Sequence, residues 1–218
     1  MQTELKNLIE MRTKQLAPDV PDDRWLWPQP DTGGWAGPFS DWESSHRHKY
    51  FQHLKGNSVI VTAGANCGAY VRAYAAKFDT VFAFEPDWLN FYCMCYNTPY
   101  FNVKKFNTAL GNAPGFCTLN DKNKKNCGSF RVIRDAAREE CHIPVMTIDS
   151  LRLNACDMIQ LDVEGYEFEA LEGGTGTIEK FKPVVVVENH KKTVEEFLFA
   201  RGYKFQEKSI SDYIYYPA

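Results

Sequence analysis

The chain has 218 residues, 44% of them hydrophobic, 14% aromatic and 24% charged, and it carries a formal net charge of −3. A disordered chain would hold fewer apolar and aromatic residues, so this composition indicates a globular protein. No apolar run approaches the about 18 residues that a membrane span requires, and the near-neutral charge disfavours a dedicated nucleic-acid binder. We therefore expect one domain with a short appendage, and neither a membrane nor a nucleic acid as its partner.

The N-terminus and the seven cysteines predict the cellular compartment. The first residues lead into charged side chains and lack the apolar core of a secretion signal. The cysteines form no Cys-x-x-Cys pair and show no paired zinc spacing. We therefore expect free thiols, a cytoplasmic location and no structural metal.

Residues 1–56 form a prefix whose composition differs from that of the remaining chain. Apolar positions near helical spacing predict a helix over residues 1–17, which ends at Pro18. Residues 17–50 are rich in Pro and Gly, which argues against a long regular element, yet they hold four of the five tryptophans. Four indole rings are too much apolar surface to leave in water. We expect the prefix to be an ordered cover, a lid over a substrate site, or the contact surface of a homodimer.

Residues 57–218 form the predicted main domain, in which strands and helices alternate. Short apolar runs predict strands, and apolar positions at helical spacing predict helices. The expected strands cover residues 58–62, 80–84, 103–110, 116–119, 130–133, 157–161, 183–188, 203–207 and 212–216. The expected helices cover residues 69–78, 87–97, 167–171 and 193–201. This alternation predicts an α/β fold with a doubly wound sheet.

A glycine turn after the first of these strands is the strongest local sign of function. Gly64 and Gly68 lie between the strand and the next helix, where glycine permits a sharp turn and the close approach of a ligand. Glu85 ends the next strand, where a carboxylate can accept hydrogen bonds from two ribose hydroxyls. The spacing G-x-x-x-G differs from the G-x-G-x-x-G of NAD-binding turns. The turn therefore disfavours an NAD(P)-dependent oxidoreductase, which is kept as an alternative.

Several blocks of the sequence, in the right order, resemble the FkbM-type S-adenosylmethionine-dependent methyltransferases, within the Rossmann-like class I methyltransferases. The matching blocks are 64–68, 84–86, 107–112 with Gly115, 126–129, 144–151, 157–167, 170–174 and 183–188. The resemblance covers residues 57–216 and implies a Rossmann-like sheet of seven strands, mostly parallel, with an antiparallel last strand. The chain departs from the family at Thr62, where an acid is usual, so a charge toward the cofactor's ammonium group is missing there.

The resemblance implies a binding site for S-adenosylmethionine. It assigns the following residues to the cofactor: Thr62, Gly64, Ala65, Asn66, Gly68, Glu85, Pro86, Thr108, Ala109, Leu110 and Asp162. The glycine turn would hold the methionine part, Glu85 the ribose, and the segment around Thr108 would lie near the adenine. Asp162 would face the amino group of the cofactor or the reacting centre.

Methyl transfer to a hydroxyl requires a base that takes the proton. The expected catalytic residues are Asp162, Glu164 and His190, with Glu188 as a further candidate. They follow two strands that we expect to be neighbours, and the carboxyl ends of such strands bind ligands. An unperturbed histidine has a pKa of about 6.5, which suits a base. The carboxylates could instead hold a divalent cation that polarises the hydroxyl, and the sequence does not choose between these roles.

The methyl acceptor is the least constrained part of the prediction. The first hypothesis is O-methylation of a small molecule or glycan, although family membership does not fix the acceptor atom. The alternatives are the NAD(P)-dependent oxidoreductase and a non-catalytic cofactor-binding module. Residues 101–140 carry a surplus of four positive charges. This basic stretch is either a solvated loop or a surface that meets an anionic acceptor.

Overall fold

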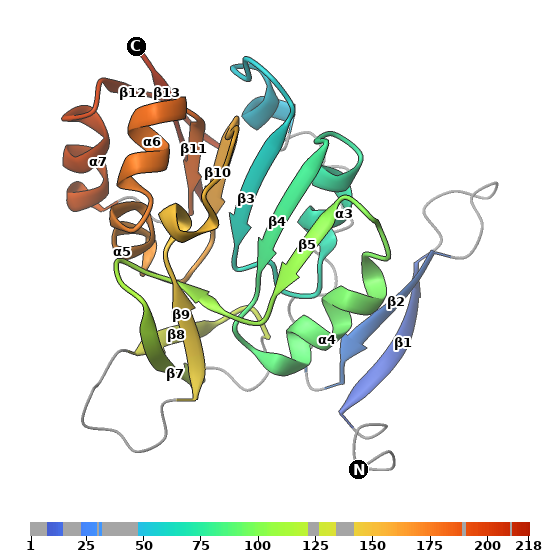
Figure 1. The fold of residues 1–218 in the computed structure, drawn as a ribbon. Helices are drawn as coiled ribbons and strands as arrows, with labels where there is room; N and C mark the ends of the chain where they lie inside the picture. The colour runs from blue at the N-terminus through green and yellow to red at the C-terminus, as the bar shows by residue number, and fades with distance from the viewer. Residues whose placement is uncertain are drawn as a thin grey trace.

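The structure is a computed structural model that describes residues 8–14, 23–29, 31, 48–121, 127–133, 142–188, 191–209 and 211–218. A central sheet lies between two groups of helices, with a small sheet below it and a separate hairpin at one side (Figure 1). None of the helices in these ranges combines the length and the apolar character that a membrane crossing needs.

The central sheet has seven strands in the order β12-β13-β11-β10-β3-β4-β5. Its parallel strands are β3 (Val59–Ala63), β4 (Thr80–Phe84), β5 (Val103–Phe106), β10 (Met158–Leu161) and β11 (Val184–Val187). β13 (Asp212–Pro217) pairs antiparallel with β11 and with β12 (Tyr203–Ser209). The predicted Rossmann-like sheet, mostly parallel with an antiparallel last strand, is confirmed.

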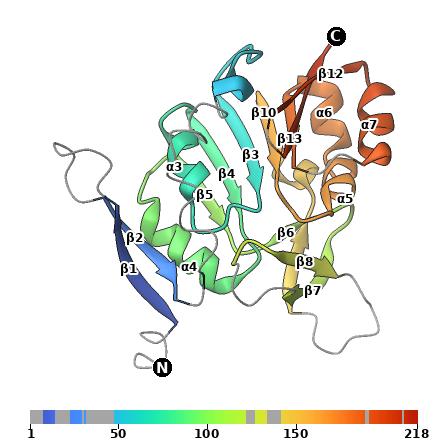
Figure 2. The same cartoon turned by 180° about the vertical axis from the view of Figure 1, so that it is seen from behind.

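Successive residues of the parallel strands face different helices, because strand side chains alternate between the two faces of a sheet. Val61 belongs to the core under α5 (Glu167–Glu172), α6 (Thr175–Phe181) and α7 (Lys192–Phe199). Ile60 belongs to the core on the other face, which α3 (Ala69–Ala75) and α4 (Trp88–Asn97) cover. Figure 2 shows α3 and α4 on that side. Both faces are therefore buried, as is usual for a mostly parallel sheet.

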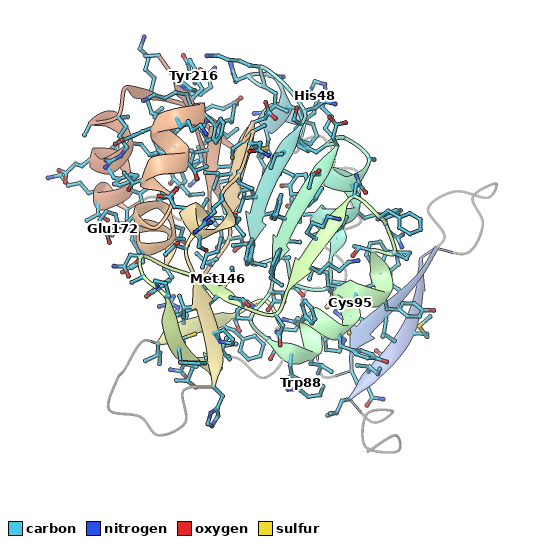
Figure 3. The ribbon with its side chains drawn as sticks, in the orientation of Figure 1. His48, Trp88, Cys95, Met146, Glu172 and Tyr216 are labelled. Atoms are coloured by element: carbon cyan, nitrogen blue, oxygen red, sulfur yellow. The ribbon has the colours of Figure 1, made fainter. Side chains whose placement is uncertain are left out.

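α4 buries one side and exposes aromatic residues on the other. Cys93 and Met94 are fully buried, whereas Trp88, Tyr92 and Tyr96 remain 54%, 45% and 53% exposed. The side chain of Trp88 lies at the surface in Figure 3. The helix begins where Asp87 accepts hydrogen bonds from the backbone N–H groups of Leu89 and Asn90. Asp87 thus fixes the start of the helix beside the end of β4.

A small sheet lies between β5 and β10 in the chain and has the order β6-β9-β7-β8. Its strands are β6 (Ala109–Leu110), β7 (Gly115–Asp121), β8 (Phe130–Ile133) and β9 (Ile143–Met146). The strand predicted over 103–110 is therefore two strands, in two different sheets. Asn107 lies at the break, where its side-chain amide donates to the carbonyls of Glu85 and Pro86. The sequence patterns also missed β9, a 3-10 helix (Ile148–Leu151) and α6.

The helix predicted over residues 1–17 is wrong within the described part of the prefix. Residues Ile9–Lys14 form strand β1, which pairs antiparallel with β2 (Asp23–Pro28). Apolar spacing suggested a helix, but a paired strand supplies backbone partners that spacing within one segment does not reveal. β2 also shows that the stretch 17–50 contains a regular strand, although a short one.

The described part of the prefix packs against the main domain through β2. Trp25 and Trp27 are 2% and 1% exposed, in a cluster with Cys67 and Cys93. The Asn97 side chain accepts from the Leu26 N–H at 2.7 Å and donates to the Leu26 carbonyl at 2.9 Å. Asn97 also donates to the Cys67 carbonyl at 2.8 Å, so one amide ties β2 to the glycine turn. The other two prefix tryptophans, Trp35 and Trp42, lie outside the described residues, and the lid stays a prediction.

We expect the substitution Asn97→Ala to lower the free energy of unfolding by at least about 2 kcal/mol, because it leaves two buried backbone groups of Leu26 without partners. Urea denaturation measures this loss. The matched control is Asn112→Ala, which removes an exposed asparagine that donates to Glu172. The control should change stability by about 0.5 kcal/mol or less. Equal losses in both variants would show that Asn97 does not anchor the prefix.

Candidate functional site

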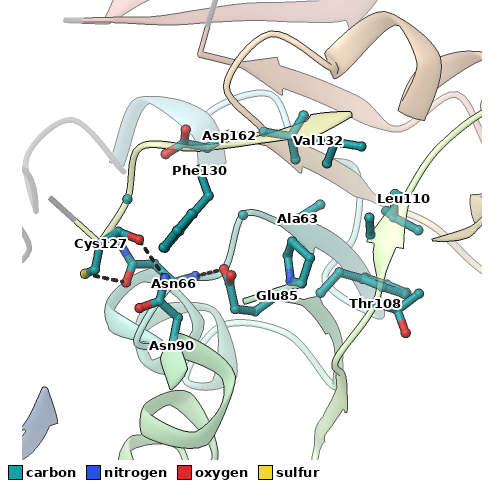
Figure 4. Close-up of a pocket in the computed structure, with 16 residues that line it drawn as sticks. Ala63, Asn66, Glu85, Asn90, Thr108, Leu110, Cys127, Phe130, Val132 and Asp162 are labelled. Carbon is teal, nitrogen blue, oxygen red and sulfur yellow. Dashed lines mark hydrogen bonds between the residues drawn. The ribbon is translucent and has the colours of Figure 1, made fainter. Parts of the chain in front are cut away.

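A pocket opens at the carboxyl ends of β3, β4 and β10, next to β6 and β8 (Figure 4). Its empty volume, which includes the solvent at the mouth, is about 570 Å³. In a doubly wound sheet ligands bind at this edge, so the position agrees with the fold.

The glycine turn follows β3 at the base of the pocket. Gly64 has a φ of 75°, and a Cβ atom there would lie 1.7 Å from the backbone oxygen of Asp162. Only glycine permits that approach between the ends of β3 and β10. The backbone N–H groups of Gly64 and Ala65 both donate to the carbonyl of Phe84, at 3.1 and 3.0 Å. These bonds fix the turn against the end of β4.

The second glycine of the turn has a different role. Gly68 has a φ of 91°, and α3 begins at the next residue. A Cβ atom at Gly68 would lie 2.8 Å from the methyl carbon of Thr98, which follows α4. Gly68 therefore lets α3 start close to α4. The G-x-x-x-G spacing reflects two separate close approaches, one to β10 and one to α4.

Glu85 is a buried carboxyl group that lines the pocket and is 4% exposed. One carboxyl oxygen accepts from the Asn66 N–H at 2.7 Å, and the other accepts from the Asp87 N–H at 2.9 Å. Burial raises the pKa of Glu85 to about 8, although these two hydrogen bonds act in the opposite direction. Glu85 is therefore held in a fixed position and takes up a proton near neutral pH.

Most of the residues that the resemblance assigns to the cofactor meet at this pocket. The lining includes Gly64, Asn66, Glu85, Pro86, Thr108, Ala109, Leu110 and Asp162. Three assigned residues do not line it. The hydroxyl of Thr62 donates to the side chain of Gln160, the N–H of Ala65 donates to Phe84, and Gly68 precedes α3. The roles of all these residues toward the cofactor stay predictions.

Other residues of the lining carried no role in the sequence-based prediction. These are Ala63, Phe84, Asn90, Cys127, Gly128, Phe130, Val132 and Val163. The amide of Asn90 donates to the carbonyl of Cys127 at 2.6 Å and so attaches this wall of the pocket to α4. The sequence did contain one signal for this wall of the pocket. The block 126–129 matches the FkbM pattern, but no function was assigned to it.

Three carboxylates lie together at the other side of the pocket. Asp162 follows β10 and Glu188 follows β11, and the N–H of Glu188 donates to the carbonyl of Leu161. One oxygen from each of Asp162, Glu164 and Glu188 lies within 4.8 Å of the others. Burial raises the pKa of Asp162 well above its ordinary value, and the charge and hydrogen bond of Glu188 add to the effect. His190 lies outside the described residues.

A second pocket adjoins this acidic group. Its lining consists of Arg131, Val132, Glu164, Gly165, Tyr166, Glu188 and Lys191. Val132 lines both pockets, and Asp162 lines the first while its neighbours Glu164 and Glu188 line the second. The carboxylates therefore lie at the boundary between two pockets. Oxygen ligands of this kind suit a divalent cation, and the cation stays a prediction.

Comparison with protein families gives one match. The family model described as the methyltransferase FkbM domain matches residues 62–205, which is more than half of the chain. No curated protein matches the sequence.

Comparison with solved structures supports the fold. A methyltransferase FkbM from Methylobacillus flagellatus KT is 16% identical, with a TM-score of 0.50, over 73% of this chain and 43% of that chain. The 16S rRNA N2 G1207 methyltransferase of T. thermophilus, solved with AdoMet and guanosine, is 10% identical, with a TM-score of 0.53, over 96% of this chain and 50% of that chain. The present chain thus spans about half or less of these relatives.

The raised pKa of Glu85 predicts a pH-dependent stability. Between pH 4.5 and about 8 the folded protein holds a proton that the unfolded chain has lost. The free energy of unfolding should therefore fall as the pH rises through this window, by at most about 1.4 kcal/mol per pH unit from this group. Urea denaturation at pH 6, 7 and 8 should show a flatter dependence for Glu85→Gln than for the wild type.

The matched control for this experiment is Glu172→Gln. Glu172 is exposed on α5, where Figure 3 labels it, and it lines neither of the two pockets. Its variant should keep the slope of the wild type. Parallel curves for the wild type and Glu85→Gln would contradict the raised pKa.

Proposed function

The chain belongs to the FkbM methyltransferase family, and we propose that it transfers a methyl group from S-adenosylmethionine to a hydroxyl of a small molecule or glycan. The cofactor binds in the first pocket. The acceptor binds in the second pocket, on the other side of the acidic group formed by Asp162, Glu164 and Glu188. The observation that carries the proposal is the buried Glu85 beside the glycine turn.

Glu85 is suited to hold a ribose. Two backbone N–H groups fix its carboxyl oxygens, and each oxygen keeps a lone pair for a further hydrogen bond. Two vicinal hydroxyls can fill these positions. Hydroxyl donors favour the ionised carboxylate, so binding should release the proton that burial retains.

The remainder of the first pocket fits the two ends of the cofactor. Phe84, Leu110 and Val132 give an apolar surface for a flat purine ring. Gly64, Asn66 and Asp162 lie near the turn, where the polar methionine end requires hydrogen-bonding groups. Thr62 is buried, and its hydroxyl donates a hydrogen bond to Gln160 in the neighbouring strand β10. We therefore assign Thr62 a role in supporting the turn.

The position of the acidic group supports a role in the transfer. S-adenosylmethionine, when bound, supplies an electrophilic methyl group on a positively charged sulfur. Asp162 faces the first pocket, and Glu164 and Glu188 face the second, so a carboxylate of this group can accept the proton of the acceptor hydroxyl. The pocket walls hold the reacting groups in line, which is the main requirement of a displacement reaction.

The alternatives from the sequence receive no support from the site. The family match and the G-x-x-x-G spacing both disfavour an NAD(P)-dependent oxidoreductase. A formed pocket with a fixed Glu85 and three adjacent carboxylates also disfavours a module without activity. A homodimer through the prefix, a cytoplasmic location and an anionic acceptor at the basic stretch stay predictions.

Ligand binding tests the proposal directly. We expect S-adenosylhomocysteine at 100 times its Kd to stabilise the protein by about 2.7 kcal/mol, which raises the Tm by several degrees. Thermal denaturation should show this shift for the wild type and for the exposed control Glu172→Ala. Glu85→Ala should lose it, because the ribose contact is gone, and NAD⁺ should shift neither protein. The absence of a shift for the wild type at millimolar ligand would overturn the proposal.

A further inference from the structure

Three cysteines from distant parts of the chain lie together at the wall of the first pocket. Cys67 belongs to the glycine turn, Cys93 to α4, and Cys127 to the segment before β8. All three pack in the cluster that also holds Trp25 and Trp27. The thiols of Cys67 and Cys127 donate to the side chains of Asn90 and Asn66. This group of thiols has no role in the proposed methyl transfer.

Two asparagines each connect Cys67 with Cys127. The side-chain oxygen of Asn66 accepts from the Cys67 N–H at 2.6 Å and from the Cys127 thiol at 3.5 Å. Asn90 accepts from the Cys67 thiol at 3.8 Å and donates to the Cys127 carbonyl at 2.6 Å. Figure 4 shows both asparagines beside Cys127. Each of the two cysteines therefore contacts both asparagines, one through its backbone and the other through its thiol.

The three thiols differ in access to solvent. Cys67 and Cys93 are 0% exposed, whereas Cys127 is half-buried and lines the first pocket. Burial raises the pKa of Cys67, and its hydrogen bonds with Cys127 and Cys93 add to this effect. A thiolate is the form that reacts with an oxidant, and reaction also requires access. A dissolved oxidant can therefore reach Cys127 through the pocket before it reaches the other two.

We propose that Cys127 and Cys67 form a reversible disulfide in the wall of the cofactor pocket when the protein meets hydrogen peroxide. The Cys127 thiolate attacks one peroxide oxygen, the O–O bond breaks, and the other oxygen leaves as water after taking a proton. The product is a sulfenic acid on Cys127. The sulfur of Cys67 then loses its proton and attacks the Cys127 sulfur, and a second water leaves. Two thiols and one hydrogen peroxide thus give one disulfide and two waters.

Cys67 could in principle pair with Cys93 or with Cys127. Cys67 and Cys93 are both fully buried, so an oxidant reaches neither of them, and we therefore assign Cys127 as the partner of Cys67. A disulfide requires the two sulfurs to close to about 2.05 Å, and Cys67 and Cys127 already pack in one cluster and share Asn66 and Asn90 as hydrogen-bond partners. Closure takes the Cys127 thiol away from Asn66, whose N–H holds Glu85. The disulfide therefore acts on the same residues that form the pocket.

Peptide mapping of the full chain tests the disulfide. After treatment with hydrogen peroxide and alkylation of the remaining thiols, trypsin yields peptides 56–72 and 126–131, each with a single cysteine. We expect these two peptides to be joined, with the loss of two hydrogens, and to separate on treatment with dithiothreitol. A link of Cys67 to Cys93, or oxidation of Cys127 without any link, would overturn the proposal.

Serine variants identify the cysteines involved. Cys127→Ser should abolish the link, whereas Cys93→Ser should retain it. The matched control is Cys117→Ser, which changes a buried cysteine of the small sheet outside this cluster. In Cys67→Ala, Cys127 should accumulate as sulfenic or more oxidised forms because no resolving thiol remains. A wild type that accumulates these forms at the same rate as Cys67→Ala would contradict the role of Cys67.

One further experiment, protection by a ligand of the first pocket, rests on the proposed function. S-adenosylhomocysteine at 100 times its Kd should fill the pocket that Cys127 lines and slow formation of the disulfide at least about fivefold, because the oxidant then reaches Cys127 only in the small unoccupied fraction. The disulfide itself is measured without this ligand, so a failure of cofactor binding would remove only the protection. Slower oxidation of Cys127 in the presence of this ligand, without any joined peptides, would count against the disulfide alone.

Discussion

The carbonyl oxygen of Phe84 holds the site together, because it accepts hydrogen bonds from the backbone N–H groups of both Gly64 and Ala65. These two bonds join the turn after β3 to the end of β4. They bring Asn66 to the carboxyl group of Glu85, and they leave Gly64 against the backbone of Asp162. Three neighbouring strands thus present their functional residues at one point.

The prefix is connected to this turn through β2 and Asn97. β2 reaches the main domain through Asn97, which also binds the carbonyl of Cys67. Arg72, whose guanidinium lies 3.9 Å from the ring centre of Trp25, donates to the carbonyl of Asn97. The pocket and the prefix are therefore linked through buried polar contacts, and a change in one of them can reach the other.

The sequence predicted the elements whose pattern is local. The strands at Thr80–Phe84 and Val184–Val187 are short apolar runs buried on both faces, and such runs are visible within a few residues. The turn and Glu85 were also found, because glycine and a strand-end acid have few other roles at that spacing. Asp162 and Glu188 were expected together because parallel strands end at one edge.

The features that the sequence did not predict depend on distant partners. β1 is a strand because β2 pairs with it, and β2 is in turn bound by Asn97, which lies 71 residues from Leu26. Asn90 and Cys127 line the pocket because the small sheet returns to α4, a contact that neither segment shows alone. Apolar spacing in one segment carries no information about such pairings.

A crystal structure of the chain with S-adenosylhomocysteine tests the central claim most directly. We expect the ribose hydroxyls on the carboxylate of Glu85, the purine ring near Leu110, and the sulfur directed toward the carboxylates of Asp162 and Glu188. The second pocket would then lie in front of the sulfur, as an acceptor site requires. A ligand bound elsewhere, or a sulfur that faces away from the boundary between the two pockets, would contradict this account.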